Sequence, residues 1–476
     1  MVRGVSVLGV DDKRIAEWLF LLTFFAAAYF YAGAGWNQNA TFDLTRALVE
    51  RHTFAIDAYA GNTGDVSYGN GHVYANKAPA LSFLAAVPYF FVHTFGIRNL
   101  AIACYFCTLF TCGIFAALVP ALLYRIGRRR GLDPLWSATV ALIVAFGTEL
   151  FPYSTVLMVM VPAGSLMLIA YTVRRAWVAG LAAALATAMY YICAPAMVVI
   201  ALIRGRKTLV PFIAGALPPL FGLAAYQYLC FGGLLTSSMA KTDPRFITKG
   251  GALFGLPSLD ALYGITISPY RGLLFFAPVL VMAIAPVLRT LGIVVISGIF
   301  LIFNLCYISW DAGFGVGARY LVPLIPLWGI ALLRVDKQRL VIALGVLSIA
   351  INFGVTAVDP QPSATIPRPL TQYILPLLLR GNFSPDVPIT APWSAATFTG
   401  HTSVNRLAHD EAIVFRRHAP GSLDSEWSSF NLGELIFGPG DARSLIPFGA
   451  VFLAAVAAIL WKARRLSRAS AARATR

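Results

Sequence analysis

Residues 99–130 read NLAIACYFCTLFTCGIFAALVPALLYRIGRRR, an apolar run over 99–124 followed at once by the basic cluster 125–130. An α-helical membrane span needs about 20 consecutive apolar residues, which this run supplies. Short basic loops stay on the cytoplasmic side of a membrane protein. The stretch therefore predicts a membrane-spanning helix whose C-terminal end faces the cytoplasm.

The composition of the whole chain agrees with a membrane protein. Of 476 residues, 58% are hydrophobic and 12% are charged, whereas soluble domains are about 25% charged. The net charge of +16 could suggest nucleic acid as a partner. However, the basic residues gather next to apolar runs, so the charge records orientation in the membrane, and we expect no nucleic-acid partner. These clusters are 125–130, 174–175, 204–207, 334–339 and 461–476.

Two apolar runs need special treatment if every basic cluster is cytoplasmic. If 79–95 crossed the membrane, the cluster 125–130 would end outside, so we predict that 79–95 is a juxtamembrane segment at the outer face. The run 176–203 has basic residues at both ends, so we predict two short helices that turn near 190–195. The other predicted spans are 15–35, 99–124, 134–151, 156–172, 208–231, 272–289, 291–309, 320–334, 339–357 and 445–461.

The predicted fold class is thus an all-α polytopic membrane protein with about 12 transmembrane helices, amphipathic juxtamembrane helices and an outer C-terminal segment. We expect a bacterial inner (plasma) membrane location with both termini cytoplasmic. The predicted parts are a cytoplasmic N-terminus (1–14), a transmembrane core (15–357) with a first outer loop (36–78) and the juxtamembrane segment (79–95), an outer, periplasmic segment (358–444), and a last transmembrane helix with a basic tail (445–476).

The cysteines do not indicate a metal or disulfide framework. All six lie inside apolar runs, and the C-x-x-C pair Cys104 and Cys107 has neither a second pair nor a nearby histidine. Such thiols are typical of apolar interiors. We therefore expect no metal and no cofactor.

Three cations stand at the outer ends of apolar segments, opposite to the usual charge bias. They are Lys77 in NKAPAL, Arg271 in SPYRGLLFF and Arg319 in GVGARYLVP. Snorkelling of single cations to the lipid headgroups is one explanation. Three of them together predict a phosphate site, because an arginine fork or an ammonium group suits a phosphate. Tyr74 and Tyr270 accompany these cations and are included as candidate substrate-binding residues.

The first outer loop carries two candidate catalytic acids. In ATFDLTRALVERH the apolar residues lie on one helical face, so we predict an amphipathic helix lying on the membrane surface. Asp43 lies on this helix, and Asp65 follows in a Gly/Asn-rich section that predicts turns. Either carboxylate could deprotonate an acceptor hydroxyl. The alternative for Asp43 is a surface charge that pairs with Arg46.

These features resemble the GT-C glycosyltransferases, and most closely the branch with the 4-amino-arabinose lipid A transferase and the protein O-mannosyltransferases. LTRALVE (44–50) is similar to the branch's first-loop helix, and YANKAP (74–79) to its Lys-Pro-Pro stretch, with Ala78 in place of the first proline. The paired helices of 176–203 look similar as well. The resemblance implies a polyprenyl-phosphate-linked sugar donor, a glycan, lipid or protein acceptor, and membrane lipids around the site.

One departure from the family affects the catalytic assignment. Asn37 and Gln38 stand where the family keeps an acidic pair, and an amide cannot act as a base. The role would pass to Asp43 or Asp65, with Asn37 as a substrate contact.

We therefore expect an enzyme that transfers sugar from a polyprenyl-phosphate donor to an acceptor on the outer face. Two alternatives remain. A lipid-linked sugar flippase or transporter would need ionisable groups along the middle of the spans, where the sequence has very few. A non-catalytic lipid- or glycan-binding scaffold agrees with the amides at positions 37 and 38.

Overall fold

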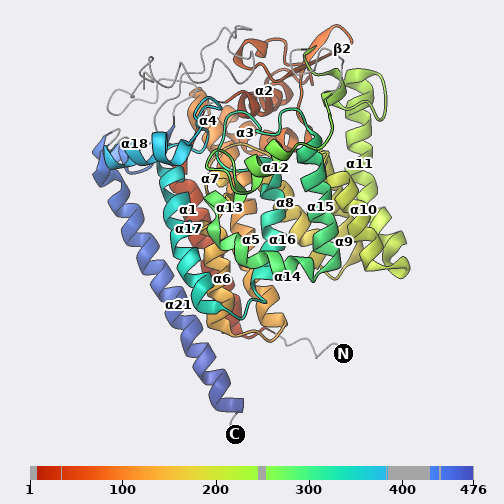
Figure 1. Cartoon of the computed structure of the whole chain (residues 1–476). Coiled ribbons are helices and arrows are strands. Elements are labelled where there is room, and N and C mark those ends of the chain that lie inside the picture. The colour runs from red at the N-terminus through yellow and green to blue at the C-terminus, as the bar shows by residue number, and fades with distance from the viewer. Residues whose placement is uncertain are drawn as a thin grey trace.

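The computed structural model describes residues 8–33, 35–244, 253–381, 383, 429–438 and 441–474. It is mostly helical, with two small two-stranded sheets (Figure 1). The predicted centre of the outer segment, 384–428, lies outside the described residues.

The principal helices are α1 (Val10–Tyr29), α2 (Trp36–Glu50), α3 (Ala80–Thr94), α4 (Leu100–Thr108), α5 (Ile114–Arg129), α6 (Pro134–Phe146), α7 (Leu150–Ser154), α8 (Met160–Thr172), α9 (Ala176–Met189), α10 (Cys193–Arg204), α11 (Leu209–Phe231), α12 (Leu259–Thr266), α13 (Leu273–Phe276), α14 (Ile284–Leu288), α15 (Leu291–Cys306), α16 (Ile325–Leu332), α17 (Gln338–Val358), α18 (Leu375–Leu379), α20 (Glu434–Phe437) and α21 (Ile446–Ala474). The strands are β1 (Phe30–Tyr31), β2 (Val66–Gly69), β3 (His72–Ala75) and β4 (Phe430–Asn431).

Helix length and composition support a membrane protein. Four helical stretches of the described chain are long and apolar enough to cross a membrane: Leu100–Arg129, Arg206–Phe231, Gln338–Val358 and Ala442–Ala472. The described residues also form shorter apolar helices of 10–17 residues. The helical membrane class agrees with the sequence expectation, and the count of 12 spans stays a prediction.

Both ends of the described chain lie at one end of the molecule (Figure 1). Near the start of α1, Asp12 Oδ1 accepts a hydrogen bond from Arg128 Nε of α5 at 2.8 Å. The neighbouring Asp11 pairs with Lys462 of α21, with Oδ1 and Nζ 2.9 Å apart. The basic clusters 125–130 and 461–476 therefore meet at this end, which we call the basic end.

The predicted break within 176–203 is confirmed. Helix α9 ends at Met189 and α10 begins at Cys193, so the chain turns at 190–192. At the end of α10, Arg204 donates hydrogen bonds to the carbonyl oxygens of Ala170 (3.3 Å) and Arg174 (3.0 Å). The start of α9 and the end of α10 therefore both lie next to the C-terminal end of α8.

The helix α2 differs from its prediction. It forms where expected, but residues 37–45 are all buried, polar side chains included. Gln38 Nε2, for example, lies 3.2 Å from Tyr31 Oη and 3.3 Å from Cys104 Sγ. The expected exposed polar face is therefore absent, because neighbouring elements cover the polar face of α2 as well as its apolar one. The position of α2 at the membrane surface stays a prediction.

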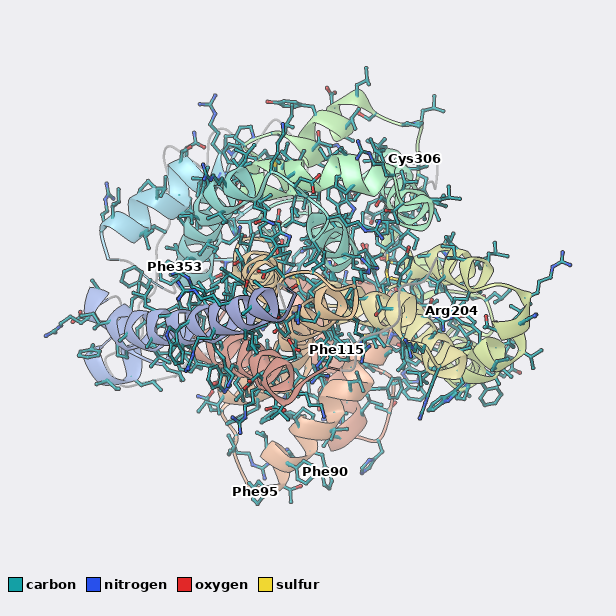
Figure 2. The ribbon with its side chains drawn as sticks, turned by 90° about the horizontal axis from the view of Figure 1, so that it is seen from below. Phe90, Phe95, Phe115, Arg204, Cys306 and Phe353 are labelled. Atoms are coloured by element: carbon teal, nitrogen blue, oxygen red, sulfur yellow. The ribbon has the colours of Figure 1, made fainter. Side chains whose placement is uncertain are left out.

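The helix α3 packs on α2 at the end of the molecule opposite the basic end (Figure 1). Ser82 Oγ donates to Thr41 O of α2 at 2.9 Å. The other face of α3 exposes large apolar side chains, and Figure 2 shows Phe90 and Phe95 at the rim of the molecule. This one-sided burial suits the predicted juxtamembrane position, which stays a prediction.

The first outer loop also contains a β-hairpin that the all-α prediction did not include. Strands β2 and β3 pair antiparallel, with Val66 opposite Ala75 and Gly69 opposite His72. Between them Asn70 and Gly71 both have positive φ, 49° and 79°. A two-residue turn of this kind favours Asn-Gly and matches the twist of the flanking strands. A second small sheet pairs β1 with β4 and ties the end of α1 to the segment 429–438.

Candidate functional site

The hairpin brings Asp65 and Lys77 together. Asp65 immediately precedes β2 and Lys77 is the second residue after β3, so the antiparallel register places Asp65 opposite Asn76 and next to Lys77. Asn76 N donates to Asp65 O at 3.0 Å. Lys77 Nζ lies 2.8 Å from Asp65 Oδ2, and the two side chains are 20% and 14% exposed. This mostly buried ion pair is the centre of the candidate site.

Ser238 connects the segment that carries Lys77 to the turn between α9 and α10. Ser238 Oγ lies 3.0 Å from Asn76 O and 3.2 Å from Lys77 O. On its other side, Tyr191 Oη lies 3.1 Å from the same Ser238 Oγ. Ser238 therefore links the backbone at Lys77 to the helix break at 190–192.

Arg319 is the third charged member of the cluster. It begins the short 3₁₀ helix η7 (Arg319–Leu324) and is buried. Burial and the charge of Arg319 lower the pKa of Lys77 below its usual value, while Asp65 opposes this shift. Arg319 Nη1 donates to Phe314 O at 2.8 Å, and its Nε has no hydrogen-bond partner in the described part of the chain. The structure thus gathers two predicted cations and one predicted acid.

Aromatic rings surround the cluster. The Arg319 guanidinium carbon lies 5.7 Å from the centre of the Tyr320 ring. The Tyr320 ring in turn lies 5.7 Å from Tyr307 and 6.5 Å from Tyr190 between ring centres. The sequence interpretation missed these tyrosines. The predicted break at 190–195 was the available signal for Tyr190, because residues at a helix break face the end of the bundle.

Arg271 occupies a different position, with its side chain fully buried. Its Nη2 donates to Gly313 O at 2.6 Å and its Nη1 donates to Gly315 O. Both glycines have positive φ, 68° and 149°, which the chain adopts readily only at glycine. Arg271 therefore holds the loop that leads into Arg319. Its direct contact with a phosphate stays a prediction.

Tyr270 lies beside Arg271 and contacts the chain that follows α17. The Arg271 guanidinium carbon stacks 4.3 Å from the centre of the Tyr270 ring. Tyr270 Oη lies 2.7 Å from Ala364 O and 3.2 Å from Asp311 Oδ2. Tyr270 thus connects two loops, and its role in substrate binding stays a prediction.

Asp43 lies fully buried on α2. The alternative in which Asp43 pairs with Arg46 on the surface is wrong, because Arg46 pairs with Glu50 at 3.2 Å. A base must reach the hydroxyl that it deprotonates, so the partly exposed Asp65 is better placed than Asp43.

The remaining candidates have separate surroundings. Asn37 lies in the first turn of α2, and its buried Oδ1 has no hydrogen-bond partner in the described part of the chain. Tyr74 packs into an apolar cluster, with its ring centre 5.3 Å from that of Phe231. Substrate contacts of both residues stay predictions.

Two cations beside one carboxylate give the cluster a net positive charge, which suits an anion such as a phosphate. The described residues contain no group of three or more histidine, cysteine, aspartate or glutamate side chains that could hold a metal ion.

Comparison with known proteins does not identify a family for this chain. No protein-family model matches the chain, and no curated protein sequence matches it.

Proposed function

We propose that the chain is a membrane glycosyltransferase of the GT-C type. It transfers sugar from a polyprenyl-phosphate donor to an acceptor at the outer face of a bacterial inner membrane. In this proposal about 12 segments span the bilayer, some of them shorter than the usual 20 residues. The basic end faces the cytoplasm, so both termini are cytoplasmic.

The observation that carries the proposal is the 2.8 Å pair of Lys77 and Asp65 with Arg319 beside it. The pair lies on the hairpin, which stands at the end of the molecule opposite the basic end (Figure 1). A cytoplasmic basic end puts the cluster at the outer surface. The short motifs that resemble the GT-C branch lie in the same loop.

The donor phosphate would bind to Lys77 and Arg319. Without donor, Lys77 is neutralised by Asp65. A phosphate competes with the carboxylate for the ammonium group and releases Asp65 from the pair. Donor binding thereby frees the base that the next step needs.

In the transfer step, the acceptor oxygen attacks the anomeric carbon of the sugar and forms the new glycosidic bond. The bond from that carbon to the phosphate oxygen breaks, and the acceptor proton moves to Asp65. Negative charge then builds up on the departing polyprenyl phosphate. Lys77 and Arg319 stabilise this charge in a site already arranged for it.

The proposal is tested by binding of undecaprenyl phosphate to the purified protein. Lys77→Ala and Arg319→Ala should each weaken binding by about 1.5–3 kcal/mol, roughly ten- to a hundredfold, since each removes a charge-assisted contact. Lys241→Ala is the matched control, because Lys241 is exposed in the segment that packs under the hairpin.

Equal binding by the wild type and both cluster variants would contradict the phosphate site and favour snorkelling cations. Tight donor binding by the wild type without transfer to any of a broad panel of acceptors would favour the non-catalytic scaffold.

A further inference from the structure

We propose that Asn304 and Tyr190 form a sugar-recognition floor beneath the Lys77–Arg319 cluster, and that the sugar it recognises is uncharged. This inference rests on the proposed function, because it concerns the sugar of the same donor.

Asn304 is a polar residue in an otherwise apolar buried stripe. On α15 the inward-facing residues are spaced three or four apart, and they continue from Ile293 and Ile296 through Phe300 to Asn304. Asn304 is fully buried, and neither its Oδ1 nor its Nδ2 has a hydrogen-bond partner in the described part of the chain. Buried amides are nearly always hydrogen-bonded in folded proteins. The side-chain amide of Asn304 can therefore serve as a hydrogen-bond donor and acceptor for a ligand.

Tyr190 approaches the same place from the α9–α10 turn. Its ring centre lies 6.4 Å from that of Phe300, which precedes Asn304 by one helical turn. Its buried hydroxyl also has no hydrogen-bond partner within the described ranges. The charge of Arg319 acts on Tyr190. The two buried polar side chains therefore lie on elements that contact each other, α15 and the α9–α10 turn, and the charge of Arg319 acts on one of them, Tyr190.

The position relative to Lys77 follows from the contacts below the hairpin. The residue after Tyr190 is Tyr191, which reaches Lys77 O through Ser238. In this proposal the sugar of a donor whose phosphate binds Lys77 and Arg319 lies against this floor.

The chemistry of the floor fits a sugar with free hydroxyl groups. A carboxamide offers both a donor and an acceptor, and a phenol offers one of each, which complements neighbouring hydroxyl groups. Tyr307 and Tyr320 add aromatic walls. Apolar and aromatic walls with a few fixed polar groups are the usual composition of a site for a small molecule.

The charges of the site disfavour an amino sugar. When the donor is bound, Lys77 and Arg319 face its phosphate, and the polar groups of the floor, the Asn304 amide and the Tyr190 phenol, carry no negative charge that could pair with an amine. The charge of Arg319 acts on Tyr190, and it would repel a protonated sugar amine at the floor, because like charges oppose each other's ionised form. We therefore expect neutral hexosyl or pentosyl donors rather than 4-amino-arabinosyl donors.

The test compares binding of four ligands by purified full-length protein in detergent. The ligands are undecaprenyl phosphate, its glucosyl and mannosyl derivatives, and its 4-amino-arabinosyl derivative. For the wild type, at least one neutral sugar should tighten binding relative to undecaprenyl phosphate, and the amino sugar should not. Asn304→Leu and Tyr190→Phe should each weaken binding of that neutral donor about tenfold, as expected when a polar contact is lost, and leave undecaprenyl phosphate within twofold.

Tyr171→Phe is the matched control, because it removes a phenol hydroxyl near the end of α8 on the basic side. Asn304→Leu also gives a second readout: removing an unpaired buried amide should leave the thermal midpoint equal or higher, whereas a structural amide would lower it.

Three results would overturn the inference: a sugar that adds no affinity, tighter binding of the amino-sugar donor, or equal weakening of all ligands by both variants. If undecaprenyl phosphate binds normally in these cases, the proposed function survives while the floor does not. No binding of undecaprenyl phosphate by the wild type would remove both.

Discussion

Asp65→Asn is expected to bind undecaprenyl phosphate more tightly than the wild type and yet fail to transfer sugar. The substitution keeps the shape of the side chain and removes its charge. The backbone contacts of this residue do not use the carboxylate, since Asp65 N donates to Thr63 Oγ1 at 3.0 Å and Asp65 O accepts from Asn76 N. The hairpin should therefore remain folded.

The size of the gain follows from the pair. In the wild type a bound phosphate must displace a charge-assisted contact of about 1.5–3 kcal/mol. A phosphate about 6 Å from the carboxylate is also repelled by roughly 3 kcal/mol at an effective dielectric constant of about 20. The side chains are partly exposed, at 20% and 14%, and the ammonium can share both anions. We therefore expect a net gain of about 1–2 kcal/mol, or roughly five- to thirtyfold in affinity.

The assay is calorimetric titration of undecaprenyl phosphate into wild type, Asp65→Asn, Lys77→Met and the double variant. The gain should appear in Asp65→Asn and vanish when Lys77 is also replaced. The free Asp65→Asn protein should melt at a lower temperature, because Lys77 is left without its partner, and ligand should restore its stability. Unchanged or weaker binding by Asp65→Asn would refute the exchange of Asp65 for phosphate.

Further expectations concern the other acid, the topology and the outer segment. Asp43→Asn should retain most of the transfer activity, and a loss of about 10²–10⁴-fold would move the role of the base to Asp43. The topology is tested in a Cys306→Ser background, which removes the one cysteine that is not buried. An impermeant thiol reagent added outside should label Arg98→Cys and should not label Arg129→Cys. Equal protection of both cysteines would mean that 79–95 crosses the membrane. Burial raises the pKa of Asp359 to about 7, so the folded state retains a proton that the unfolded state loses above about pH 4. Stability should therefore fall as pH rises from about 4 to 7 and then level off, and Asp359→Asn should flatten this part of the thermal-midpoint profile; an identical profile would contradict the assignment.

Local sequence patterns predicted most of the helices. Apolar runs closed by basic clusters indicated the helical segments, and basic residues at both ends of 176–203 indicated the break after Met189. The hairpin was also readable, because Asn70-Gly71 between alternating residues is a strong two-residue turn signal. Because the hairpin was not predicted, the contact between Asp65 and Lys77 was not expected.

The remaining features depend on contacts between distant segments. Periodicity on α2 showed an apolar face, but it could not show that other elements cover the polar face with Asp43. From the sequence, Arg271 was expected to be available to a ligand phosphate. Its guanidinium group instead donates to carbonyl oxygens of residues more than 40 positions away. Asn304 is a single amide in an apolar run, and its surroundings are defined only once α15 packs against η7 and α10.

Sugar transfer is measured as release of undecaprenyl phosphate from its glycosyl derivatives in proteoliposomes, with a bacterial envelope extract as the source of acceptors. We expect release by the wild type and by Lys241→Met, and a loss of about 10²-fold or more in Asp65→Asn, as for removal of a catalytic base. Lys77→Met should also be strongly impaired, because it lacks the cation that binds the phosphate. Donor that binds to the wild type but is never cleaved, or equal release by wild type and Asp65→Asn, would contradict the proposed function.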